Sequence, residues 1–224
     1  MKTVLITGAN KGIGLETTKV LLASGFRVIA LSRHVDNLKN IETANLLIYQ
    51  VDLLQQADLL KVLSEIKIKS GRIDILINNA GIGLFKRIED CTIEEWNSVI
   101  QLNLTVPFIL INQLLPDMIL NQYGRIINIG SDADSLPFPN AGVYCATKYG
   151  LRGMTESIRL DIKNTNVNIS TISPGRVDTY FNKKKPGCRP NALKVSDVAK
   201  QILFILQQED RCNIEQIKLT SALE

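Results

Sequence analysis

The chain has 224 residues, of which 45% are hydrophobic and 21% are charged, with a formal net charge of +4. This composition predicts one globular domain over residues 1–224 and argues against intrinsic disorder. The lack of a basic block mixed with aromatic residues argues against nucleic-acid binding. Four scattered cysteines without a CxxC pair and a single histidine argue against a disulfide framework and a zinc site, so we expect free thiols in the cytoplasm and no metal.

Short runs rich in valine, isoleucine and leucine recur along the chain and predict strands that are buried on both faces. The runs cover residues 4–6, 27–31, 46–50, 73–77, 125–129, 167–172 and 214–219. Between them, apolar residues at intervals of three and four predict amphipathic helices. These helices cover residues 14–23, 55–69, 93–102, 106–121, 144–163 and 196–207, with Gly25, Gly71 and Gly124 as expected helix ends.

The alternation of these elements predicts an α/β fold built on a doubly wound parallel sheet, the Rossmann arrangement. About seven strands would carry helices on both faces in three α/β/α layers. No apolar run reaches the roughly 18 residues of a membrane span, so we expect no contact with a membrane. The first apolar run has the length of a strand and not of a signal peptide, so we expect no targeting segment there.

A glycine-punctuated turn, 7-TGANKGIG-14, follows the first strand and opens the first helix. Gly8 can make the tight turn, while Gly12 and Gly14 let backbone amides and the helix N-terminus approach a phosphate. A glycine triplet alone is a weak signal, and its position strengthens it against the alternative of a plain connecting turn. We predict a dinucleotide site that includes Gly8, Asn10, Lys11, Gly12, Ile13 and Gly14.

The end of the second strand predicts which nicotinamide cofactor this site takes. An acidic residue there would hold a ribose 2′-hydroxyl, whereas an arginine would accept a 2′-phosphate. The chain has Ser32 and Arg33 at this position, and Lys11 adds a second cation. We therefore predict NADP(H) in preference to NAD(H). Asp36, the nearest acid, lies beyond the strand and is expected to cap the next short helix.

Tyr144 and Lys148 lie four residues apart and therefore share one helix face, where the ammonium could lower the pKa of the phenol. Moving that pKa from about 10 to about 7 needs roughly 4 kcal/mol, which a positive charge about 4 Å away supplies at an effective dielectric of about 20. The pattern by itself arises by chance on exposed helices. Ser131, which ends the fifth strand, adds a hydroxyl that could bond the same substrate oxygen, with an ordinary cap as the alternative for a serine at a strand end.

With these residues in place, the chain resembles the short-chain dehydrogenase/reductase family from Lys2 to about Leu219. The glycine turn is similar to the family's TGxxxGxG, residues 78–81 to its NNAG, and residues 174–179 to its PGxVxT. The resemblance implies that Tyr144 is the acid/base, that Lys148 lowers its pKa and holds the nicotinamide ribose, and that Ser131 positions the carbonyl. It also implies that Asn103 anchors a proton-relay water, although Asn103 could instead simply end a helix.

The resemblance further implies residues that contact the cofactor, and two departures from the family pattern. The implied residues are Asp52 and Leu53 near adenine, Asn79, Ala80 and Gly81 near the ribose, and Pro174, Gly175, Val177 and Thr179 near the carboxamide, besides Tyr144 and Lys148. Gly130 stands where many members have a second serine, which should not harm catalysis because Ser131 aligns with the functional one. The short C-terminus lacks a glycine-rich tail and puts the usual tetramer in doubt.

The residues expected around the reacting carbon are mostly apolar, which favours an uncharged carbonyl or secondary alcohol as substrate. They are Ser131, Leu84, Phe85, Phe138, Tyr180 and Phe181. Some of them, Phe138 among them, could instead only pack under a lid. Residues 176–190 lack a helix or strand pattern and are expected to form that substrate loop, with an exposed connection as the alternative. Lys183–Lys185 with Arg189 leave a carrier-linked 3-oxoacyl substrate open.

Together these features predict an NADP(H)-dependent oxidoreductase that acts on a small-molecule carbonyl or alcohol. A regulatory or interaction protein that binds NADP(H) without turnover is the alternative, and the complete acid/base set counts against it. Family members usually associate through the helices over residues 106–121 and 144–163, so we expect a homodimer or a homotetramer.

Overall fold

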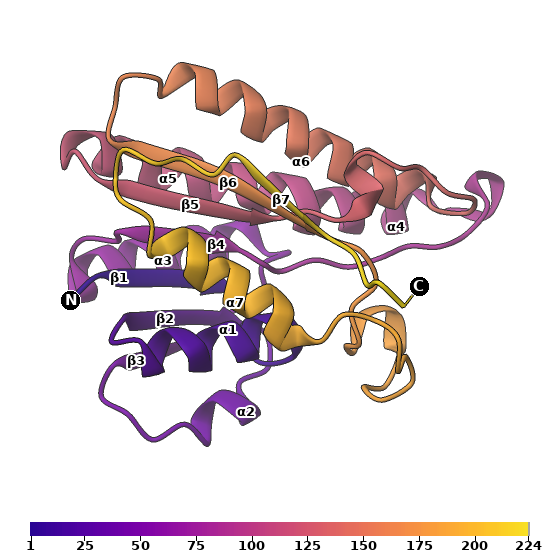
Figure 1. Cartoon of the computed structure of the whole chain (residues 1–224), viewed down its shortest axis with the longest axis horizontal. Coiled ribbons are helices and arrows are strands. Elements are labelled where there is room, and N and C mark those ends of the chain that lie inside the picture. The colour runs from indigo at the N-terminus through magenta and orange to yellow at the C-terminus, as the bar shows by residue number, and fades with distance from the viewer. Residues whose placement is uncertain (224) are drawn as a thin grey trace.

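The computed structural model describes residues 1–223, the side chain of Lys183 excepted, and within them seven parallel strands form one sheet (Figure 1). Their order is β3-β2-β1-β4-β5-β6-β7. The strands are β1 (Thr3–Thr7), β2 (Arg27–Ser32), β3 (Leu46–Gln50), β4 (Ile75–Asn78), β5 (Gly124–Ile129), β6 (Val167–Pro174) and β7 (Gln216–Leu219). The predicted doubly wound parallel sheet is confirmed.

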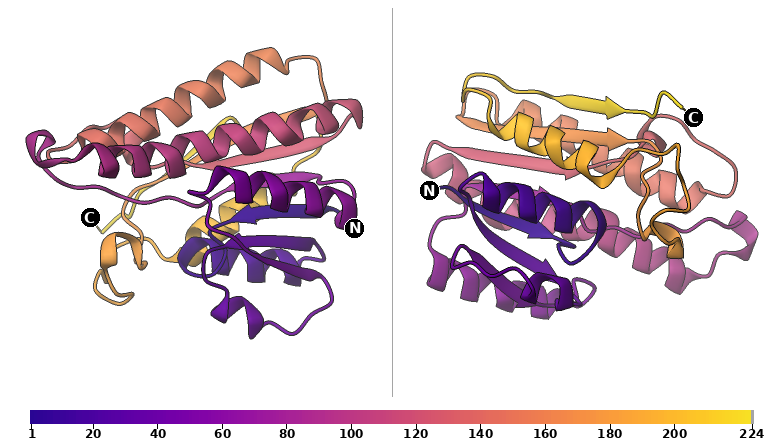
Figure 2. Two further views of the ribbon diagram at one scale, coloured as in Figure 1. Left: turned by 180° about the vertical axis from the view of Figure 1, so that it is seen from behind. Right: turned by 60° about the horizontal axis from the view of Figure 1, so that its bottom comes forward.

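Helices cover both faces of the sheet, so the molecule has three layers, which the two views of Figure 2 show from behind and from below. One face packs against α1 (Gly12–Ala23), α2 (Asp36–Lys39) and α7 (Val195–Leu206). The other packs against α3 (Gln56–Ser70), α5 (Val106–Leu120) and α6 (Gly142–Asp161), with α4 (Ile93–Ile100) leading into α5. Short turns of 3-10 helix add η1 (Ile88–Asp90), η3 (Asp132–Asp134) and η4 (Phe181–Lys183).

The central strands are buried on both faces because each must fill two hydrophobic cores. Leu5 of β1 points into the core under α3 and α5, while its neighbours Val4 and Ile6 point into the core under α1 and α7. All three are fully buried. This double burial explains why the strands read as nearly continuous apolar runs.

The two helices expected over residues 93–102 and 106–121 are one continuous helical run. A single π-helical turn, η2 (Gln101–Thr105), joins α4 to α5. By length and composition the run Ile93–Leu120 could cross a membrane, but a core helix of a soluble protein has the same properties. Here α5 buries Leu110 and Leu114 against the sheet, as a core helix does.

Two of the three glycines expected to end helices do so. Gly25 and Gly71 have φ of 81° and 68° directly after α1 and α3. The expectation is wrong for Gly124, which is the first residue of β5, because Gln122 with φ of 52° makes the left-handed turn after α5 instead. Gly124 is needed for packing, since a Cβ there would lie 2.6 Å from Cβ of Met118.

Successive strands are added toward one edge of the sheet from β1 to β3 and toward the other edge from β4 onward. The order therefore reverses between β1 and β4, which are parallel hydrogen-bonded neighbours. In an open parallel sheet, ligands bind outside the carboxyl ends of the strands at such a switch point. The segments that follow β1, β2, β4, β5 and β6 therefore lie at the edge of the sheet where a ligand would bind.

Candidate active site

The turn between β1 and α1 has a backbone that favours glycine at two positions. Gly8 has φ of 66° and Gly12 has φ of 57°, both in the left-handed region. Gly14 is required for a different reason, because a Cβ there would lie 2.3 Å from the carbonyl oxygen of Gly8. The three glycines together let the start of α1 lie directly against the end of β1.

The first turn of α1 fits an anionic group such as a pyrophosphate. Lys11 is the N-cap residue in an extended conformation, its side chain makes no capping hydrogen bond, and the turn has no acidic residue. The first N–H groups of a helix, here those of Gly12, Ile13 and Gly14, have no intrahelical acceptor and carry the positive end of the helix dipole. A phosphate can accept from them without displacing a protein side chain.

Asn10, which the sequence predicts as a cofactor-contacting residue, turns its side chain to the beginning of α2. Its Oδ1 accepts hydrogen bonds from the backbone N–H of Asn37 at 2.9 Å and of Leu38 at 3.4 Å. The expectation that Asp36 caps α2 is wrong: Asp36 is the first residue of the helix, its N-cap is Val35, and Asn10 bonds the free N–H groups instead. Asn10 thereby ties the glycine turn to the segment after β2.

Ser32 and Arg33 lie beside the glycine turn, because Gly8 N–H donates to the carbonyl of Leu31 at 2.8 Å. Ser32 is buried and Arg33 is exposed. Lys11 is exposed as well, and its ammonium lies 5.7 Å from the ring centre of Tyr180. Among the described residues no carboxylate forms an ion pair with Arg33 or Lys11, so both cations remain available to a phosphate.

Asp52 and Leu53 follow β3 at the same edge of the sheet. The backbone N–H of Val51 donates to the carbonyl of Ser32 at 3.0 Å, which keeps this segment beside the end of β2. Asp52 Oδ1 accepts from the N–H of Leu54 at 3.1 Å, and Leu53 is buried. The turn therefore holds Asp52 beside the end of β2, where the sequence predicts the adenine end of a cofactor.

Asn79 braces the glycine turn from the end of β4. Its Nδ2 donates to the carbonyl oxygens of Thr7 at 2.8 Å and Gly8 at 3.2 Å. The backbone N–H groups of Asn79 and Ala80 both donate to Thr7 Oγ1 at 3.0 Å. The 79–81 segment, which ends at Gly81, thus closes the switch point between β1 and β4, a supporting role that the sequence did not predict for the Asn79 side chain.

The predicted acid/base residues meet where α6 begins and β5 ends. Tyr144 and Lys148 are each 6% exposed on consecutive turns of α6. Lys148 Nζ donates to the carbonyl of Ile129 at 2.8 Å and lies 5.7 Å from the ring centre of Tyr144. Ser131 is the N-cap of η3, where its Oγ accepts from the N–H of Ala133 at 3.2 Å.

Burial controls the protonation of both groups. Desolvation raises the pKa of Tyr144 to about 12, while a hydrogen bond with Ser131 acts in the opposite direction and Asp132 adds to the increase. Desolvation also lowers the pKa of Lys148 to about 8, against the attraction of Asp134. The sequence predicts a phenol pKa near 7 set by Lys148 together with an oxidised nicotinamide. The residues of the protein by themselves raise this pKa instead, because a low-dielectric site disfavours the phenolate.

Asn103 lies in the π-helical turn η2 and is buried. Its Oδ1 accepts from the N–H of Ile82 at 2.9 Å, and its Nδ2 donates to the carbonyl of Ile82 at 2.8 Å and to Thr147 Oγ1 at 3.1 Å. The alternative that Asn103 only ends a helix is wrong, because the helix continues to Leu120. The π turn, a feature often found at functional sites, aims this side chain at the segment after β4 and at α6.

Three of the predicted wall residues gather around Tyr144. The ring centres of Phe85 and Phe181 lie 5.4 Å and 5.8 Å from that of Tyr144, and Phe138 stacks on Phe85 at 6.0 Å. Leu84 lines an adjacent hollow of about 240 Å³, and Tyr180 is half exposed beside Lys11. Apolar rings therefore pack around the ring of Tyr144.

The loop over residues 176–190 is tied at its base. Val177 forms a parallel bridge with Leu193, and the Gly187 N–H donates to Asp178 Oδ2 at 2.6 Å inside the loop. Thr179 Oγ1 accepts from the Phe181 N–H at 3.1 Å, which holds that ring at the site.

Before the loop, Pro174 ends β6 and the backbone N–H of Gly175 donates to the carbonyl of Leu219 at 2.7 Å. Lys184 and Lys185 are exposed, Arg189 donates to the carbonyl of Val177 at 3.2 Å, and the predicted contribution of Lys183 lies outside the described residues.

The model of the short chain dehydrogenase family matches residues 2–187. The chain belongs to the short-chain dehydrogenase/reductase family. An NADP-dependent 3-hydroxy acid dehydrogenase of Escherichia coli is 35% identical over 178 residues, which are 78% of this chain and 72% of that protein. Among solved structures, serine dehydrogenase complexed with NADP+ superimposes with a TM-score of 0.92 at 30% identity, covering 99% of this chain and 96% of the other.

A second structural relative binds the other nicotinamide cofactor. The structure of 4-hydroxyisoleucine dehydrogenase complexed with NADH and succinate has a TM-score of 0.88 at 26% identity, covering 97% of each chain. Relatives of this short-chain dehydrogenase therefore use NADP or NADH. The chain is an NAD(P)-dependent oxidoreductase.

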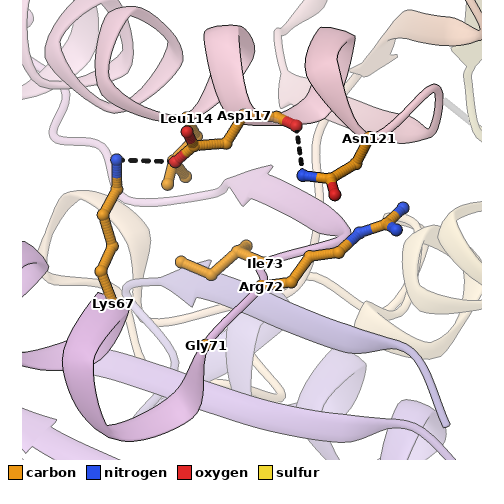
Figure 3. Close-up of a pocket in the computed structure, with 7 residues that line it drawn as sticks. All are labelled: Lys67, Gly71, Arg72, Ile73, Leu114, Asp117 and Asn121. Atoms are coloured by element: carbon orange, nitrogen blue, oxygen red, sulfur yellow. Dashed lines mark hydrogen bonds and ion pairs between the residues drawn. The ribbon is translucent and has the colours of Figure 1, made fainter.

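A hollow of about 280 Å³ lies at the other end of the short-chain dehydrogenase fold (Figure 3). Its lining includes the Gly71–Ile73 segment that precedes β4, and Lys67 and Asp117 form an ion pair of 2.8 Å on its rim. Asn121 donates to the carbonyl of Asp117 at 2.6 Å. Because these residues lie at the amino ends of the strands, the hollow is remote from the carboxyl-edge site of a doubly wound sheet.

Two acids near the phenol of this short-chain dehydrogenase were not predicted as site residues. Asp132 Oδ1 accepts from the Ser131 hydroxyl at 2.8 Å, and Asp134 is completely buried. The only sequence signal was their place, one and three residues after Ser131. In the sequence, an acid at either position is typical of an exposed loop, and only the burial of η3 in the fold indicates a role at the site.

Proposed function

We propose that this short-chain dehydrogenase uses NADP(H) and transfers a hydride between the nicotinamide and a carbonyl or secondary alcohol of a mainly apolar small molecule. The observation that carries the proposal is the meeting of Tyr144, Lys148, Ser131 and Asn103 at the carboxyl edge of the sheet, beside a glycine turn whose helix N-terminus is open to a phosphate. Residues 1–224 would act as one dinucleotide-binding domain, with the 176–190 loop as its substrate loop.

The protein residues would divide the work as follows. When bound, the nicotinamide coenzyme supplies the hydride donor or acceptor and, when oxidised, a positive ring charge. Tyr144 holds a proton at Oη, as its high pKa in the protein favours, and would donate it to the carbonyl oxygen during reduction. Ser131 orients that oxygen, and Lys148 carries positive charge next to the phenol. Asn103 fixes the segment after β4 against α6.

The preference for NADP(H) rests on the end of β2. Arg33 follows buried Ser32, is exposed and has no carboxylate partner among the described residues, as a 2′-phosphate ligand requires. Among the residues that the structure describes, Ser32 and Arg33 rather than an acid end β2 and follow it, since Asp36 begins the next helix. The relatives that are NADP-dependent or hold NADP+ agree with this preference.

The substrate class rests on the rings around Tyr144. Phe85, Phe138 and Phe181 would contact the substituents of the reacting carbon, while Ser131 and Tyr144 bind its oxygen. The exposed Lys184 and Lys185 on the loop keep a carrier-linked 3-oxoacyl substrate within the test panel.

The decisive experiment replaces Tyr144 by phenylalanine, which removes the phenol oxygen and keeps the ring. We expect NADPH oxidation over a panel of ketones, 3-oxo acids and 3-oxoacyl thioesters to fall by about 10²–10⁴-fold. Tyr149→Phe is the matched control, because Tyr149 is 44% exposed on the same helix and should keep full activity. Equal turnover in the Tyr144→Phe variant and the wild type would remove Tyr144 from the mechanism, and tight NADPH binding without turnover on any substrate would support a regulatory protein instead.

We also propose that two copies associate through α5 and α6. These helices expose large apolar side chains that the sheet does not need, among them Phe108 and Leu120 on α5 and Leu160 on α6. Sedimentation equilibrium should give at least twice the 24.9 kDa chain mass. A particle of one chain mass at micromolar concentration would contradict association.

A further inference from the structure

A buried carboxylate lies behind the acid/base pair. Asp134 of η3 has no exposed surface, and Ser173 of β6 donates a hydrogen bond to its Oδ2. Gln216 of β7 in turn donates to Ser173 Oγ at 3.1 Å. Asp134 Oδ1 is buried and has no hydrogen-bond partner among the described residues. A buried carboxylate with an unpartnered oxygen is destabilising unless a positive charge nearby compensates it.

Gly130 makes the room for this carboxylate. A Cβ at position 130 would lie 2.8 Å from Asp134 Oδ2 and 3.0 Å from Ser173 Oγ. The serine that many family members have at this position would therefore collide with Asp134 as it is placed here. The absence of a side chain at Gly130 therefore leaves the space that the Asp134 carboxylate occupies.

The cation that fits this carboxylate is Lys148. Among the described residues the buried cations are Lys148 and Arg125. Arg125 lies near the start of β5, where it donates to the carbonyls of Gln208 and Glu209. Lys148 Nζ bonds the carbonyl of Ile129, the residue directly before Gly130. Lys148 and Asp134 therefore approach the same short segment at the end of β5.

We propose that Asp134 is the internal counter-charge of Lys148 and keeps the lysine in its ammonium form inside the buried site. Asp134 is therefore a positioning residue, for which Gly130 leaves the space. Only the effect of this pairing on turnover rests on the proposed function. The pairing itself concerns two groups within this chain. It predicts a property of Lys148 that can be measured without any substrate.

Other charged and titratable groups face the same region and do not replace Asp134. Asp132 accepts from Ser131, and Lys218 of β7 donates to Ser135 Oγ at 3.1 Å. Tyr144 and Cys145 lie on the helix of Lys148 itself. Burial lowers the pKa of Lys148 to about 8, and Asp134 is the one charge that raises it among the residues described. Loss of the carboxylate charge should therefore lower that pKa further.

The test follows Lys148 directly by NMR of protein labelled with ¹³C at lysine Cε, in which Lys148→Arg identifies the resonance by its disappearance. In Asp134→Asn, which keeps the shape and removes the charge, we expect the titration midpoint of Lys148 to fall by about one pH unit or more. Gly130→Ala, which forces the carboxylate to shift, should lower the midpoint in the same direction. Asp161→Asn, an exposed acid at the far end of α6, is the control and should leave the midpoint unchanged.

An unchanged midpoint in both Asp134→Asn and Gly130→Ala would overturn the pairing. If either variant unfolds, the other decides, and the NMR dispersion of the remaining lysines reports whether each is folded. A lowered midpoint in an enzyme that turns over no substrate would leave the counter-charge standing and remove the proposed function. Conversely, active enzyme with an unmoved midpoint would keep the function and remove the counter-charge.

Discussion

The proposed coenzyme side and the proposed catalytic side of the carboxyl edge, called the coenzyme side and the catalytic side below, are built by different means. The glycine turn depends on backbone conformation and close approach at Gly8, Gly12 and Gly14, and the cations beside it are exposed. The catalytic side instead buries charged and polar groups, with Lys148 at 6% exposure and Asp134 at 0%. The first side follows local rules that a sequence displays, whereas the second depends on burial that only the assembled fold creates.

The largest effect should come from adding one methyl group on the coenzyme side. In Gly14→Ala the new Cβ would lie 2.3 Å from the Gly8 carbonyl oxygen and 2.6 Å from Asn79 Nδ2, so the backbone must move. We expect a loss of about 3 kcal/mol in unfolding free energy and loss of detectable NADPH binding. Urea denaturation and a fluorescence titration measure both.

Gly153→Ala is the control for this prediction. Gly153 lies inside α6, and a Cβ there would meet no atom within 4 Å. Alanine should therefore stabilise the protein by up to about 1 kcal/mol through its higher helix propensity. If Gly14→Ala were as stable as Gly153→Ala, the close approach would not be what requires glycine in the turn.

On the catalytic side, removal of a charge should stabilise the fold. Lys148→Met keeps the length of the side chain and removes an ammonium that burial disfavours. The variant leaves Asp134 without its counter-charge, but the pKa of Lys148 is lowered to about 8 with Asp134 in place, so desolvation outweighs that attraction. We therefore expect the unfolding free energy at pH 7 to increase by about 1–3 kcal/mol while turnover is lost. Equilibrium urea unfolding beside an NADPH oxidation assay tests the pair of outcomes. A variant that is less stable than the wild type would mean that Asp134 and the Ile129 carbonyl more than compensate for burial.

The exposed cation on the coenzyme side should affect binding without affecting the fold. In Arg33→Ala we expect the Kd for NADPH to rise by about 10–100-fold, because a charge-assisted hydrogen bond to a phosphate is lost, and the Kd for NADH to stay the same. Arg27→Ala at the opposite end of β2 is the control and should change neither constant. An equal loss of affinity for both coenzymes would place Arg33 away from a 2′-phosphate.

The contrast explains which features the sequence could predict. The seven strands and the six long helices follow from apolar periodicity, because burial on two faces makes β1 and β4 nearly continuous apolar runs. Tyr144 and Lys148 could be paired because their spacing is local. The π turn at Asn103 escaped prediction because no sequence signal separates it from an ordinary α-helix. The same holds for Asn10 and Asn79, whose side chains bond groups 27 and 71 residues away in the chain.

The pKa of Tyr144 shows the same limit in energetic terms. Charge attraction from Lys148 could be estimated from the spacing, but desolvation could not, since it depends on Phe85 and Phe181 packing over the ring from two other segments. Desolvation has the largest effect on this pKa and raises it to about 12. The spacing of Tyr144 and Lys148 alone therefore cannot give the protonation state of the phenol.

The smallest predicted effect is a change in stability with pH that isolates the burial of Lys148. Its pKa falls from 10.5 to about 8 on folding, so between these two pH values the unfolded chain binds more protons at this site than the folded one. Stability contributed by this site therefore rises with pH across that window. The advantage of Lys148→Met over the wild type should be greatest at pH 7 and should shrink steadily by pH 10.

Urea unfolding of both proteins at several pH values between 7 and 10 measures this difference, with Lys163→Met as the control. Lys163 is exposed beyond the end of α6, so its methionine variant should differ from the wild type by the same amount at every pH. The raised pKa of Tyr144 lowers the stability of the protein only above the ordinary phenol pKa near 10. Tyr144 is present in every variant, so this contribution cancels in the comparison. An advantage of Lys148→Met that stays constant or grows with pH would show that desolvation of the Lys148 ammonium does not destabilise the wild type. Only a desolvated ammonium regains stability when it loses its proton.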